Sequence, residues 1–145
     1  MPVIGTGALA LVLGATFSAT AAMAHLACIV IGAPAYRFMG AGDRMVQAVE
    51  AGKRAPALIT LAIAGILLAW AVFALSGAGV VGTLPLTRSA LVAISVAYIG
   101  RAVCFPLIKP NFPGNSNTFW LVSSGLCGLI GLVHAYGTVS LWHAM

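Results

Sequence analysis

Acidic residues are nearly absent from this sequence. Asp43 and Glu50 are the only two among 145 residues, against seven lysines and arginines, which gives a formal net charge of +5. Charged residues make up 6% of the chain and hydrophobic residues 61%, far from the composition of soluble domains. We therefore expect an integral membrane protein. So few basic residues form no face for a polyanion, and we expect no nucleic-acid partner.

Motifs for redox, metal or hydrolytic chemistry are also missing. Cys28, Cys104 and Cys127 lie in apolar runs and form no C-x-x-C pair, which argues against a redox dithiol or a zinc site. The sequence has no H-E-x-x-H, no G-x-S-x-G and no paired carboxylates within an apolar segment. The sequence therefore favours a protein without enzymatic activity over an enzyme, and we predict no cofactor.

Four apolar segments are each long enough for the ~20 residues that a helix needs to cross a bilayer. They cover residues 4–33, 56–78, 86–107 and 118–141. The predicted fold is a single domain over residues 1–145, an all-α integral membrane protein with four transmembrane helices in a bundle. Residues 1–24 contain no Lys or Arg, so we expect the first segment to be a span and not a cleaved signal peptide.

Helix boundary signals flank these segments. Pro34 is expected to stop the first helix, and Thr87 is a candidate N-cap of the third. In the first loop, Asp43 is expected to cap a short amphipathic helix that Gly52 ends. We expect this short helix to lie on the membrane surface.

Basic residues are concentrated in two of the loops. The first loop contains Arg37, Arg44, Lys53 and Arg54, the third contains Lys109, and the opposite side has only Arg88. The positive-inside rule then predicts that the first and third loops are cytoplasmic and that both termini are outside. We expect the chain to reside in a bacterial-type cytoplasmic (inner) membrane.

Polar residues fall at similar depths on three of the predicted helices. At about 1.5 Å per residue, His25 and Arg101 both lie ~12 to 13 Å from the cytoplasmic helix ends. Ser123 and Ser124 lie ~8 to 9 Å deep on the fourth helix. Arg101, His25, Ser123 and Ser124 are therefore candidate ligand-binding residues of a cytoplasmic-side polar pocket.

Arg101 needs a partner if it is buried, because a charge in hydrocarbon is costly. Asp43 and Glu50 are the candidate carboxylates, and we include both in the predicted site; the alternative is that they balance neighbouring Arg and Lys side chains. Pro106 leaves two possibilities open. It either ends the helix, so that Arg101 extends to the headgroups, or kinks a continuing helix, so that Arg101 faces a pocket.

His25 and His134 are weaker candidates, as haem ligands. Counted along their helices, the two imidazoles differ by ~11 Å in depth, which staggers them badly for one haem. Each histidine is more readily explained as a packed polar residue that is hydrogen-bonded to a neighbouring backbone or hydroxyl group.

Small residues recur every four positions on two helices. Ala10, Gly14, Ser18 and Ala22 do so on the first, and Cys127, Gly131 and Ala135 on the fourth. Such stripes let helix backbones approach closely in lipid. We expect the first and fourth helices to pack together, or to form a face for a homo-oligomer or another membrane subunit.

The four-helix plan and the Gln47-x-x-Glu50 stretch of the first loop resemble the small membrane glutathione-transferase (MAPEG) family. The likeness covers one short stretch, and the fourth helix lacks the arginine expected at its start, so no residue role is carried over. The primary expectation is an accessory or scaffold membrane subunit. The alternatives are an oligomeric transporter, channel or small-anion or lipid-binding protein that uses Arg101 and His25, and a small membrane enzyme or haem protein.

Overall fold

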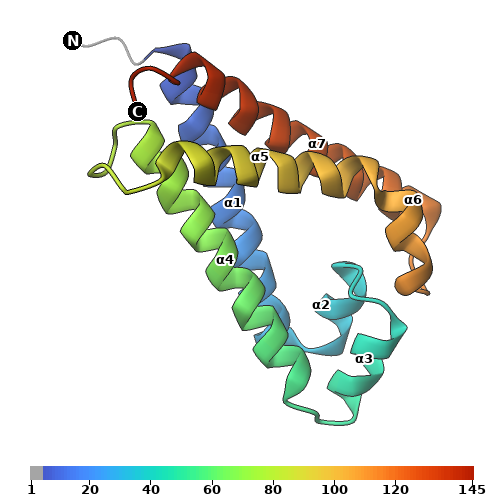
Figure 1. Ribbon diagram of the computed structural model, residues 1–145. Coiled ribbons are helices and arrows are strands. Elements are labelled where there is room, and N and C mark those ends of the chain that lie inside the picture. The colour runs from blue at the N-terminus through green and yellow to red at the C-terminus, as the bar shows by residue number, and fades with distance from the viewer. Residues whose placement is uncertain (1–4) are drawn as a thin grey trace.

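The computed structural model describes residues 5–145 and consists of helices, turns and loops (Figure 1). Helices account for 79% of it and no strand occurs in this range, which confirms the all-α class. Three helices are long and apolar enough to cross a membrane, or four if a bent pair counts as one span.

Helix α1 covers Thr6–Ile31, and α2 covers Ala33–Phe38. Ile4, the predicted start of the first span, lies outside the described residues. The predicted end at residue 33 is two residues late, because the chain turns at Gly32, whose φ is 86°. Pro34 lies in the first turn of α2, where its missing N–H costs no hydrogen bond, so it begins a helix there and does not stop one.

Helix α3 covers Asp43–Glu50 and is the short amphipathic helix predicted for the first loop. Its buried residue, Val46, packs with Tyr36 of α2 and Cys28 of α1. The N-cap is Gly42, so Asp43 is the first helical residue and not the cap. Gly52, at a φ of 69°, follows the helix as predicted.

Helix α4 covers Ala55–Gly77 and α5 covers Thr87–Val103. Thr87 is the first residue of α5, not its N-cap, which is Leu86. Helix α6 covers Phe105–Ile108, η1 covers Lys109–Asn111, and α7 covers Asn117–Ser140. The side chain of Ser116 caps α7 by accepting a hydrogen bond from the Phe119 N–H at 3.0 Å.

The third predicted span is not one straight helix. Helix α5 ends at Val103, and the following segment is bent from it by 68°. Pro106 explains the bend, because proline cannot donate the backbone hydrogen bond that a continuing helix requires, whereas the first turn of a new helix tolerates it. The single helix predicted over residues 86–107 is therefore corrected to α5 and α6.

The long helices form two antiparallel pairs, and we call each pair an arm. Helices α1 and α4 make the first arm and α5 and α7 the second. The arms meet where α1 begins and α7 ends, which we call the apex, and diverge toward α2, α3 and α6 (Figure 1). The first and third loops therefore lie together at the wide end, and the C-terminus lies at the apex.

Small residues mediate the meeting of the arms. Gly14 of α1 lies against His134 of α7, and Gly137 of α7 lies against Leu11 of α1. The predicted packing of the first and fourth helices is thus present at the apex. The α1 stripe Ala10, Gly14, Ser18 and Ala22 is buried within the chain. In the α7 stripe, however, Gly131 lies against Tyr98 and Ile99, so it faces α5 and not α1.

A contact between two loops holds the arms together at the wide end. We call these loop segments, residues 40–43 and 112–115, the clasp. The Asp43 N–H donates to the Pro113 carbonyl at 3.1 Å, and the Asn115 side-chain amide donates to the Gly40 carbonyl at 2.9 Å. Gly40 lies against the Phe119 ring and Gly42 against Phe112. The clasp thereby closes the wide end between the arms.

Candidate functional site

Arg101 lies in the last turn of α5, half-buried against α7. Its guanidinium donates to the Ser123 hydroxyl at 3.0 Å and to the Ser124 hydroxyl at 3.3 Å. The guanidinium carbon also lies 5.0 Å from the centre of the Trp120 ring. Three of the six predicted site residues, Arg101, Ser123 and Ser124, are therefore in direct contact.

An aromatic cluster supports this arginine. Trp120 is only 2% exposed, and its ring centre lies 5.8 to 6.5 Å from the ring centres of Phe105, Phe112 and Phe119. The bend before Pro106 turns Phe105 and Phe112 toward the start of α7. The cluster holds the Trp120 face in place beneath Arg101, an arrangement suited to a cation–π contact.

The two carboxylates do not pair with Arg101. Glu50 forms an ion pair with Arg37 at 2.7 Å, with both side chains about half exposed (48% and 60%). Asp43 is exposed, its carboxylate lies beside Gly114, and its backbone N–H belongs to the clasp. Within residues 5–145, no ion pair links Arg101 to either acid. The structure therefore agrees with the alternative interpretation of Glu50, in which its carboxylate balances the charge of a neighbouring arginine.

His25 does not join the Arg101 contacts. It is half-buried on α1, and its Nδ1 lies 2.7 Å from the Ala21 carbonyl oxygen of the same helix, to which it donates. No hydrogen bond from His25 to another helix is present in the part of the chain that the structure describes. Counting residues along the helices places His25 and Arg101 at the same depth. The count gives no information on the direction in which each side chain points.

His134 is a core residue at the apex. It is fully buried, its Nδ1 lies 2.8 Å from the Ile130 carbonyl, and its ring stacks on Tyr98 with centres 5.5 Å apart. Because a carbonyl only accepts, Nδ1 carries the proton, and the buried Nε2 has no partner among the described residues. Each proposed haem ligand is thus bonded to its own helix, and residues 5–145 hold no group of three metal-ligating side chains.

Two further hydroxyl pairs of the core connect different helices. The Ser18 and Tyr98 hydroxyls are 2.8 Å apart, and Trp70 of α4 packs edge-on against the Tyr98 ring. In the first arm, the Tyr36 hydroxyl lies 2.9 Å from the Thr60 hydroxyl, which ties α2 to α4. The sequence did not indicate these pairs, since lone Ser, Thr and Tyr residues in apolar helices carry no spacing signal.

The Arg101 contacts favour the binding of an anion. A guanidinium has five N–H donors, and the two serine hydroxyls occupy two of them. The hydroxyls are neutral, so the positive charge is not balanced by an acid. A phosphate or carboxylate oxygen would supply both the charge and the acceptors.

Comparison with known proteins gives no match for this chain. No protein-family model, no curated protein and no solved structure is significantly similar to it. Any functional assignment therefore rests on the fold and on the contacts described above.

Proposed function

We propose that this chain is an integral membrane protein with four spans, in which α5 and α6 together form the third. Large apolar side chains are exposed along both arms, as a lipid-facing surface requires. Examples on four helices are Leu13, Leu61, Ile66, Val96, Leu121, Leu126 and Leu132. The two arms diverge, and tilted spans of this kind are common in membrane proteins.

The orientation that we propose puts the wide end in the cytoplasm. The wide end carries the basic residues of the first and third loops, whereas the apex carries Arg88. By the positive-inside rule, the wide end then faces the cytoplasmic headgroups of a bacterial-type inner membrane. Both chain ends would lie on the opposite side.

The function that we propose is the binding of an anionic headgroup or small anion at Arg101. The observation that carries this proposal is a half-buried guanidinium held by two neutral hydroxyls and an aromatic face, with no carboxylate of the described residues in contact. Arg101 is one helical turn from the bend, so an anion can approach it from the headgroup layer. Both lipid phosphate and free phosphate have the required chemistry.

Thermal unfolding in neutral maltoside micelles tests this proposal, with inorganic phosphate and phosphatidylglycerol as separate additives. Arg101→Gln should weaken the apparent affinity for the additive, read from the shift in unfolding temperature, about tenfold. It removes the positive charge but keeps a side chain that can form hydrogen bonds. The matched control is Arg54→Gln, an exposed cation at the same end. A response to phosphatidylglycerol alone identifies a lipid site, and equal responses of wild type and Arg101→Gln refute the proposal.

A second candidate function, an accessory membrane subunit, is favoured by the divergence of the arms. The arms diverge from the apex (Figure 1). The large apolar side chains exposed along both arms offer surface for another membrane chain. Mass measurement of the protein extracted in mild detergent tests this. A second polypeptide in fixed ratio supports it, and a lone monodisperse monomer counts against it.

A further inference from the structure

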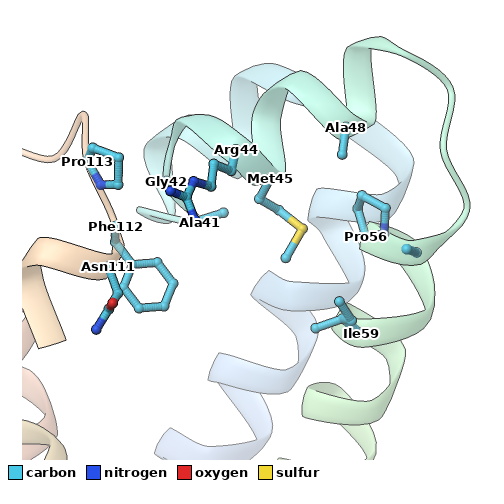
Figure 2. Close-up of a pocket in the computed structure, with 11 residues that line it drawn as sticks. Ala41, Gly42, Arg44, Met45, Ala48, Pro56, Ile59, Asn111, Phe112 and Pro113 are labelled. Atoms are coloured by element: carbon cyan, nitrogen blue, oxygen red, sulfur yellow. The ribbon is translucent and has the colours of Figure 1, made fainter.

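A hollow of about 300 Å³ lies between the two arms at the wide end, behind the clasp. Figure 2 shows Met45 and Ala48 of α3 on one side, Pro56 and Ile59 of α4 on another, and Phe112 of the third loop across from them. These are apolar side chains from three separate segments. The hollow is thus formed by the tertiary structure and not by one helix.

The charged side chain that lines this hollow is Arg44 (Figure 2). Arg44 is exposed, and within residues 5–145 its side chain makes no hydrogen bond and no ion pair. This distinguishes it from Arg37, which is bound to Glu50. The site therefore combines an apolar interior with one uncompensated positive charge at its edge.

We propose that this hollow binds a single-chain anionic amphiphile, with the chain against Met45 and Ile59 and the anionic head at Arg44. Apolar walls favour an alkyl chain because they remove it from water, and the guanidinium favours a phosphate or carboxylate head. The volume lies at the lower end of the range for small-molecule sites, which suits one alkyl chain.

The position of the hollow agrees with this ligand. The inference rests on the proposed membrane placement, in which the wide end lies at the headgroup layer, but it does not depend on Arg101. A ligand that enters from the bilayer would place its alkyl chain against Ile59, which is 47% exposed, before its anionic head meets Arg44. The clasp segment Phe112–Pro113 forms the opposite wall, so the bound alkyl chain would contact both α4 of the first arm and the loop that leads into α7.

Binding of octyl phosphate to the full chain in neutral micelles tests the inference, with octanol and inorganic phosphate as the two half-ligands. Wild type should bind octyl phosphate at least about tenfold more tightly than either half-ligand, since each contributes only one part of the interaction. Arg44→Gln should reduce octyl phosphate binding to the level of octanol. Because Arg101 is itself a proposed phosphate site, the comparison is made in an Arg101→Gln background, where Arg44→Gln should still lower octyl phosphate binding to the level of octanol, so the two sites are tested separately.

Filling the hollow provides the second variant. Ala48→Phe places a ring among the lining residues and should abolish binding of octyl phosphate and octanol alike. Ala51→Phe is the matched control, because Ala51 is exposed at the end of α3 and does not line the hollow. Should Ala48→Phe fail to fold, Arg44→Gln decides. The inference is overturned if Arg44→Gln or folded Ala48→Phe binds octyl phosphate as tightly as wild type does. It is also overturned if wild type does not prefer octyl phosphate to the two half-ligands.

Discussion

The hydroxyl of Tyr98 lies 2.8 Å from the hydroxyl of Ser18, and this hydrogen bond joins α5 of the second arm to α1 of the first. Both residues are buried, and the Tyr98 ring is packed between Trp70 and His134. A polar pair in an apolar surrounding has no water to replace a lost partner. We therefore regard it as a determinant of how the arms are joined.

Tyr98→Phe should lower the free energy of unfolding by about 0.5 to 1.5 kcal/mol, because the Ser18 hydroxyl loses its partner on the other arm. Ser18→Ala should have a similar effect. Unfolding by SDS titration from mixed micelles measures both variants and the double variant. Since they break the same bond, the double variant should be little worse than either one. Fully additive losses would show that the hydroxyls do not interact.

Gly14→Ala should destabilise the apex by about 1 to 3 kcal/mol, the usual cost of overpacking. A methyl group at Gly14 would lie 2.7 Å from His134 Cε1, and the ring is held on its other face by Tyr98. Gly65→Ala is the control, because no described atom other than its own helix backbone lies within 4 Å of the added carbon, and it should be neutral or stabilising. His134→Ala should relieve the Gly14→Ala defect by removing the ring. A Gly14→Ala protein as stable as wild type would contradict the close packing.

The long helices could be predicted from the sequence because each lies in a long apolar run. Helix α4 covers Ala55–Gly77 and α7 covers Asn117–Ser140, each within one residue of the predicted bounds. Pro106 was ambiguous, since proline within an apolar run is compatible with a kink or with an end. The structure contains elements of both, a helix end at Val103 and a short helix after the bend.

The candidate site could be predicted only in part. Depth counted along the helices placed Arg101 near Ser123 and Ser124, and these residues are in contact. Depth alone does not give the rotation of each helix, so it groups His25 with these residues although His25 bonds within its own helix. The Arg44 hollow depends on the position of α3 against the third loop, a long-range contact that no local pattern encodes. The ligand-binding roles of all these residues stay predictions.

Gly40→Ala should open the clasp. Gly40 has a φ of 73° and lies against the Phe119 ring, so an alanine there meets both a backbone penalty of about 1 to 2 kcal/mol and a steric clash. Gly52→Ala is the control, because Gly52 has a similar φ of 69° but no described atom other than those of its chain neighbours lies within 4 Å of the added carbon. Spin labels at the exposed positions Lys53 and Thr118 report the separation of the arms. We expect a broader distance distribution for Gly40→Ala than for Gly52→Ala, and equal distributions would refute a role of this contact.

Single cysteines should report the proposed membrane topology. In a background with Cys28, Cys104 and Cys127 replaced by alanine, Lys53→Cys and Thr118→Cys lie at the wide end, and His143→Cys lies at the apex; all three positions are exposed. A membrane-impermeant maleimide applied to intact spheroplasts should label His143→Cys alone, and applied to inverted vesicles it should label the other two. The basic first loop is the physical reason, since its cations resist translocation. The reverse pattern would overturn the orientation, and labelling of all three from one side would overturn the four-span arrangement.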